Sequence, residues 1–252
     1  MIRGIWLLGA LLLTPLVSTA SDKVTVALAS NFTQAAREIA DAFTAATGHE
    51  VQFSISSSGK LYAQISHGAP FDVFLSADAE RPTLLESNGL VVPGTRRTYA
   101  TGRLTLWSVD QRYEGKDCVA ELKAGNFDRL AIANPKTAPY GVAAEEALTV
   151  LGPDKQDLTT RIAMGESIAQ ALQFVASRSA SMGFIASAQL QLPDIPEGTC
   201  HWQVPEELHT RIEQQVVLLK RAEDNAAAKA FVTFLAGEQA RAIILSHGYG
   251  LE

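Results

Sequence analysis

The feature that most constrains the fold is the alternation of short apolar runs with amphipathic stretches along the chain. Residues 24–29 (VTVALA) have the length and composition of a buried strand, and the amphipathic stretch 32–47 follows them and ends at Gly48. Strands that alternate with helices favour an α/β fold in which helices cover both faces of mostly parallel sheets. The pattern predicts strands over 24–29, 51–55, 71–76, 104–109, 130–133, 182–185 and 216–219, and helices over 32–47, 60–66, 81–88, 141–151, 167–177 and 226–245.

The first twenty residues have the pattern of a secretory signal peptide. Arg3 supplies one positive charge, residues 4–17 are almost entirely apolar, and the small residues of 18–20 follow. The apolar run is shorter than the roughly 20 residues that a transmembrane helix needs, so a membrane anchor is the weaker alternative. We expect cleavage after Ala20 and export to the periplasm.

The charge balance limits the kind of partner. The chain has 21 Lys and Arg against 27 Asp and Glu, a net charge of −6, and its basic residues do not cluster. This balance argues against nucleic acid or an anionic membrane surface as a partner. A small anion remains possible, because a buried site need not alter the net charge.

The two cysteines, Cys118 and Cys200, stand too far apart for a C-x-x-C redox pair and are too few for a zinc site. In an exported protein, two such cysteines favour a single disulfide over two free thiols. The five histidines have no metal-ligand spacing, and the sequence contains no G-x-S-x-G or P-loop motif. We therefore expect a protein that is not an enzyme and that has no cofactor or metal cation.

Polar residues stand at the predicted start of four helices. Ser30 and Asn31 open the first, the serines of 56–58 open the second, and the runs 137–141 (TAPYG) and 165–168 (GESI) precede two later ones. A helix N-terminus exposes unpaired N–H groups and about half a positive charge, and in open α/β sheets it lies where ligands bind. Each cap alone is ordinary helix chemistry. Together, the four indicate a possible anion site built from neutral donors.

Several runs of the sequence are more specific. They are ASNF at 29–32, SSSGKLYAQI at 56–65, GAPFDVFLSAD at 68–78, LAIANP at 130–135, APYG at 138–141 and GYG at 248–250. In these runs the chain resembles the periplasmic molybdate-binding proteins of ABC transporters, which belong to the type II periplasmic binding proteins. The likeness extends, in order, over essentially the whole chain after the signal peptide.

The resemblance implies a two-lobed α/β fold with a ligand cleft between the lobes. Lobe 1 is expected to comprise residues 21–102 and 215–252, and lobe 2 residues 103–214. It also implies capture of molybdate, together with tungstate, by a monomer that delivers the oxyanion to a membrane permease. The alternatives are a binding protein for sulfate or another tetrahedral oxyanion and the ligand-sensing domain of a regulator with the same fold.

The resemblance also implies a set of oxyanion ligands. The second serine of the set is Ser58 when the alignment is anchored on residues 68–70, and Ser57 is a one-residue alternative. Some members of the family place a tyrosine donor where this chain has Ala186, and Asn31 is expected to replace that donor. The implied ligands are Ser30, Asn31 and Ser58, with the backbone N–H groups of Tyr140 and Ile168.

Overall fold

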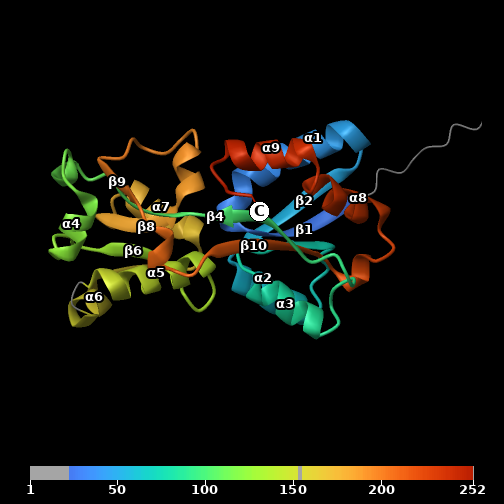
Figure 1. Ribbon diagram of the computed structural model, residues 1–252, viewed down its shortest axis with the longest axis horizontal. Helices are drawn as coiled ribbons and strands as arrows, with labels where there is room; N and C mark the ends of the chain where they lie inside the picture. The colour runs from blue at the N-terminus through green and yellow to red at the C-terminus, as the bar shows by residue number, and fades with distance from the viewer. Residues whose placement is uncertain (1–22, 153–154, 252) are drawn as a thin grey trace, which may run out of the picture.

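Apolar strands that alternate with amphipathic helices assemble into two lobes, each with a five-stranded sheet at its centre (Figure 1). The computed structural model describes residues 23–152 and 155–251, so the predicted signal peptide at 1–20 lies outside the described residues. Within the described ranges, no helix is long and apolar enough to cross a membrane. The two-lobed α/β class is confirmed.

The sheet of lobe 1 has the strand order β2-β1-β3-β10-β4. β1 pairs in parallel with β2 and β3, whereas β10 runs antiparallel to β3 and β4, so the sheet is mixed. Its strands are β1 (Lys23–Ala29), β2 (Glu50–Ser56), β3 (Val73–Leu75), β4 (Arg97–Gly102) and β10 (Ile212–Leu218). One face packs on α1 (Thr33–Thr47), α8 (Ala226–Leu235) and α9 (Glu238–Ser246), and the other on α2 (Ser58–Ser66) and α3 (Glu80–Ser87).

The sheet of lobe 2 has the order β7-β6-β8-β5-β9 and is also mixed. β6 pairs in parallel with β7 and β8, and β5 runs antiparallel to β8 and β9. Its strands are β5 (Leu104–Ser108), β6 (Leu130–Ala133), β7 (Ile162–Gly165), β8 (Met182–Ala186) and β9 (Cys200–Gln203). Its helices are α4 (Cys118–Lys123), α5 (Pro139–Leu151), α6 (Lys155–Arg161) and α7 (Ile168–Ala176).

Two chain segments connect the lobes. β4 ends at Gly102 in the first sheet and β5 begins at Leu104 in the second, while residues 204–211 lead from β9 back to β10. β10 begins at Ile212, beside β4. For the lobes themselves, the limits 21–102 with 215–252 and 103–214 stay our proposal.

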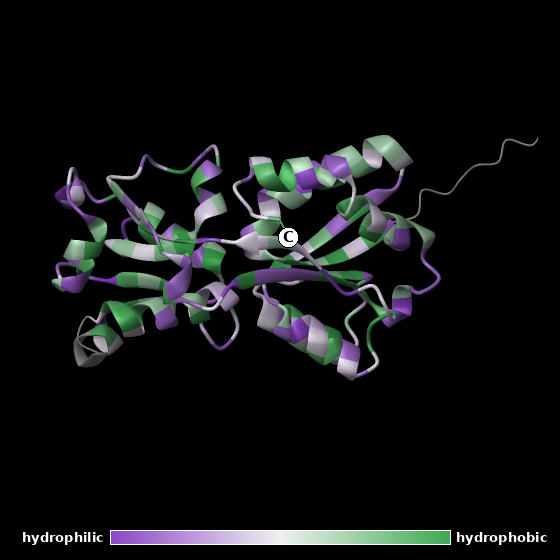
Figure 2. Ribbon diagram, in the orientation of Figure 1, coloured by the Kyte–Doolittle hydropathy of each residue, from purple (hydrophilic) through white to green (hydrophobic). Residues whose placement is uncertain are grey.

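The strands are recognisable in the sequence because they are buried in the hydrophobic cores of the lobes. Every residue of β5 is buried, as are all four of β6, because helices cover both faces of the sheet. Figure 2 shows hydrophobic colour on several strands and both colours along the helices, as expected for amphipathic helices. The pattern missed the short elements α4, α6, β7 and β9 and also β4, and it joined α8 and α9, which Gly237 separates.

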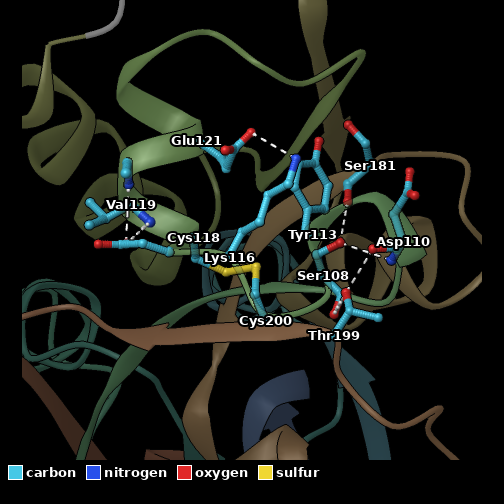
Figure 3. The surroundings of a disulfide bond; sticks show 12 residues. Ser108, Asp110, Tyr113, Lys116, Cys118, Val119, Glu121, Ser181, Thr199 and Cys200 are labelled. Carbon is cyan, nitrogen blue, oxygen red and sulfur yellow. Dashed lines mark hydrogen bonds and ion pairs between the residues drawn. A yellow bond between two sulfur atoms is a disulfide. The ribbon is translucent and has the colours of Figure 1, made fainter.

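The predicted disulfide between Cys118 and Cys200 is confirmed (Figure 3). It joins the first residue of α4 to the first residue of β9, with the two Cα atoms 5.7 Å apart. β9 is an edge strand that pairs only with β5 in its sheet. The bond therefore fastens an edge of lobe 2 to the helix beside it and does not cross to lobe 1.

Candidate functional site

A small cavity lies where the starts of four helical segments meet between the lobes. Ser30 opens the 3₁₀ helix η1 (Ser30–Phe32) and Ser58 opens α2, both in lobe 1. From lobe 2, α5 opens at Pro139 and α7 at Ile168. The lining residues are Ala29, Ser30, Asn31, Ser57, Ser58, Ala77, Ala138, Pro139, Tyr140 and Ile168. The structure thus brings all five residues of the implied ligand set, and Ser57, to one place.

The cavity wall is neutral. Among the described residues that line it, none has a charged side chain. Its positive potential comes instead from the unpaired N–H groups at the starts of α2, α5 and α7 and at η1. Such a wall suits an anion that can accept several hydrogen bonds at once.

The two serines of the second helix start differ in their bonding. The Ser58 Oγ accepts a hydrogen bond from the Ala77 N–H at 2.9 Å, which leaves the hydroxyl hydrogen free to donate. The Ser57 Oγ is buried and has no partner among the described residues. Because a buried hydroxyl normally has a partner, both serines are candidate donors to a ligand.

Asn31 is hydrogen-bonded to the protein through both its side chain and its backbone. Its Nδ2 donates to the Gln214 Oε1 at 2.7 Å, and its backbone carbonyl accepts from the Tyr249 Oη at 2.7 Å. Sequence reasoning missed Gln214, which stands between Glu213 and Gln215 in β10 and precedes the apolar run 216–219 that predicted the strand. The side-chain amide of Asn31 is therefore partly engaged, and its role as a ligand stays a prediction.

Three buried tyrosines lie near this asparagine and remain protonated. Burial raises the pKa of the Tyr99, Tyr140 and Tyr249 phenols above their usual range, and their mutual repulsion when ionised adds to the shift for Tyr99 and Tyr140. No charge therefore develops behind the cavity at neutral pH from these groups.

Direct contacts hold the lobes together beside the cavity. The Gly59 N–H donates to the Thr137 carbonyl of the opposite lobe at 2.8 Å. Lys60 pairs with Glu166 of the opposite lobe, also at 2.8 Å, so its ammonium is engaged outside the cavity. These two contacts join the lobes at the edge of the cavity, and separation of the lobes would break both of them.

Two glycines permit the close approaches on which the site depends. A Cβ on Gly59 would lie 2.8 Å from the Thr137 Cα, and a Cβ on Gly141 would collide with the Ala133 carbonyl. Gly141 thereby lets the start of α5, with the Tyr140 N–H, sit directly on the end of β6. Ala186 stands where some members of the family have a tyrosine donor. It is the last residue of β8 and does not line the cavity.

Comparison with protein families shows which class of protein this chain belongs to. The model of the family described as bacterial extracellular solute-binding protein matches residues 24–250. The chain belongs to this family. The expectation that it is a binding protein and not an enzyme is thereby confirmed.

Within this family, the chain is similar to proteins that are named for molybdate binding. The molybdate-binding protein ModA of Azotobacter vinelandii is 45% identical over 230 residues, which are 91% of this chain and 90% of that protein. The protein of the same name from Rhodobacter capsulatus is 43% identical over 244 residues, with 96% and 94% covered. The solved structure of the Azotobacter vinelandii periplasmic molybdate-binding protein superposes with a TM-score of 0.82 at 38% identity, covering 91% of this chain and 99% of that one.

Proposed function

We propose that the protein captures molybdate in the periplasm and delivers it to the permease of an ABC transporter. The observation that supports the proposal best is the cavity between the lobes, with a neutral wall formed by helix starts and serine hydroxyls. Similarity to two proteins named for molybdate binding over more than nine-tenths of the chain supports the choice of anion. We further propose that the signal peptide at 1–20 directs export, that the protein acts as a monomer, and that tungstate binds as well.

The site can supply the necessary free energy without a charged side chain. About six charge-assisted hydrogen bonds, each contributing about 1.5–3 kcal/mol, stabilise the bound dianion by roughly 10–20 kcal/mol. Dehydration of the anion and closure of the lobes offset much of this gain. A net binding free energy of about −8 to −12 kcal/mol, micromolar to nanomolar affinity, is consistent with this balance.

Selectivity follows from size and protonation. Molybdate, tungstate and sulfate are all tetrahedral dianions, so the spacing of the donors must distinguish the smaller sulfate from the other two. Phosphate carries a proton near neutral pH, and a wall made mainly of donors offers that proton no good acceptor. We therefore expect sulfate and phosphate to bind weakly.

Calorimetric titration of the protein without its signal peptide tests the proposal. Molybdate and tungstate should bind at submicromolar concentration, and sulfate and phosphate at least about 100-fold more weakly, which corresponds to about 2.7 kcal/mol. Equal affinity for sulfate would contradict the molybdate assignment and leave an oxyanion-binding protein. No binding of any of the four anions would contradict both.

A further inference from the structure

The strand β10, in the sheet of lobe 1, contains a hydrophilic stretch, seen in purple in Figure 2. Within it, Gln214 is completely buried and Gln215 nearly so. The pairing of β10 with β4 shifts register between these two residues, which is the sign of a β-bulge. Bulges occur beside functional sites, where they redirect a side chain. Here the two glutamines turn to different surroundings.

Gln214 is bonded to a wall of the anion cavity. Its Oε1 accepts from the Asn31 Nδ2 at 2.7 Å and from the Tyr99 Oη at 3.1 Å. Since Tyr249 also donates to the Asn31 carbonyl, Asn31 is held through both its side chain and its backbone. Gln214 therefore fixes a residue at the start of η1, the helical segment that contributes Ser30 to the cavity.

Gln214 also lies at the junction of the two lobes. Its Nε2 and the Tyr140 Oη are both buried without a hydrogen-bond partner among the described residues. Both atoms stand close to the position that a Cβ on Gly102 would take, at the crossover from β4 to β5. Tyr140 belongs to α5 of lobe 2, so Gln214 lies between Asn31 of one lobe and the start of a helix of the other.

An amide is the side chain that this position requires. Its oxygen serves two donors, and its NH₂ group adds positive rather than negative partial charge near the cavity. A carboxylate of the same shape would accept the same two hydrogen bonds but would add a full negative charge behind a bound anion. Asp78 is paired with Arg81 and the three tyrosines are neutral, so none of these groups offsets such a charge; the guanidinium of Arg97, on the neighbouring strand β4 and with its Nη2 buried, is the cation closest to it in the pairing register.

We propose that Gln214 is a positioning residue for anion binding that acts through Asn31 and keeps the wall behind the site free of negative charge. The inference rests on the proposed function and extends it to a residue outside the cavity lining. It predicts that the charge of residue 214, and not only its shape, sets the affinity for the oxyanion.

The test compares three variants by molybdate titration between pH 6 and 8.5. Gln214→Glu should weaken binding by about 30-fold or more at pH 8.5, and the affinity should recover as the pH falls, because burial raises the pKa of the introduced carboxyl and protonation removes its charge. Gln214→Met, which removes the hydrogen bonds at similar shape, should weaken binding about 3- to 10-fold at every pH. Gln215→Glu is the matched control, since Gln215 bonds to Arg96 and Thr98 instead. It should stay within about twofold of the unmodified protein.

The outcomes separate the inference from the function on which it rests. Failure of the unmodified protein to bind molybdate would contradict the proposed function itself. If Gln214→Glu and Gln214→Met lose the same affinity for molybdate at every pH, Gln214 has a structural role only. If both variants keep the full affinity, Gln214 has no role in anion binding. Thermal melting without ligand identifies a variant that does not fold. If Gln214→Glu does not fold, a loss of affinity in Gln214→Met with unchanged affinity in Gln215→Glu supports the positioning role of Gln214, and unchanged affinity in Gln214→Met overturns it.

Discussion

Replacing Gly59 by alanine is expected to weaken molybdate binding by about 10- to 100-fold without destabilising the unliganded protein. The new Cβ would stand 2.8 Å from the Thr137 Cα and 2.9 Å from its carbonyl oxygen, and both are main-chain atoms of the opposite lobe. Such overpacking costs about 1–3 kcal/mol, and only the closed arrangement of the lobes experiences it. Gly59 lies in α2 outside the left-handed region, so alanine suits the open protein at least as well.

Gly237→Ala is the matched control for this experiment. Gly237 also lies in lobe 1 with a negative φ, and its neighbours belong to α8 rather than to the cleft. Calorimetry should show unchanged affinity for Gly237→Ala. Small-angle scattering should show that Gly59→Ala needs about 10- to 100-fold more molybdate than Gly237→Ala to close. Full affinity in Gly59→Ala would mean that the lobes do not need the Gly59–Thr137 contact to close on a ligand.

Removing the disulfide should have the largest effect on stability. Cys118 and Cys200 are separated by 82 residues, and for such a loop the chain-entropy model gives about 4.5 kcal/mol at most. At about 2–4 °C per kcal/mol for a chain of this size, the double variant Cys118→Ala/Cys200→Ala should melt roughly 5–15 °C lower in differential scanning calorimetry. Reduction is the poorer test, because both cysteines are buried.

The same variant should bind molybdate within about twofold of the unmodified protein at 20 °C, well below its melting temperature. None of the described cavity-lining residues belongs to α4 or β9, the two elements that the bond joins. An unchanged melting temperature would show that α4 and β9 are held by packing alone. A large loss of affinity would show that lobe 2 is coupled to the site through this edge.

The sequence predicted most of the strands that contain apolar or alternating runs and missed β4, β7 and β9. The runs of β1, β5 and β6 are recognisable because both faces of each sheet are covered by helices. β7 and β9 are four-residue strands at sheet edges, with exposed residues that break the pattern. Sequence periodicity alone does not identify such strands, because their conformation depends on pairing with a neighbour.

The residues of the site also differ in how far the sequence indicated them. Ser30, Ser58 and the start of α5 stand out as polar or proline-containing helix starts, and resemblance to a family indicated which of them matter. Gln214 gave no such sign, because its importance depends on a bulge and on a contact across 183 residues. The choice between Ser57 and Ser58 likewise depends on which hydroxyl already has a partner, a property of the folded chain.

Helix starts and serine hydroxyls, without any charged side chain, are proposed to hold the oxyanion between the lobes. A crystal structure with bound molybdate, with anomalous data collected at the molybdenum absorption edge, tests this proposal most directly. One anomalous peak is expected in the cavity lined by Ser30, Ser58 and Tyr140, with hydroxyl and backbone N–H donors around the four oxygens. A peak elsewhere, or a Lys or Arg side chain within hydrogen-bond distance of the oxyanion, would contradict it.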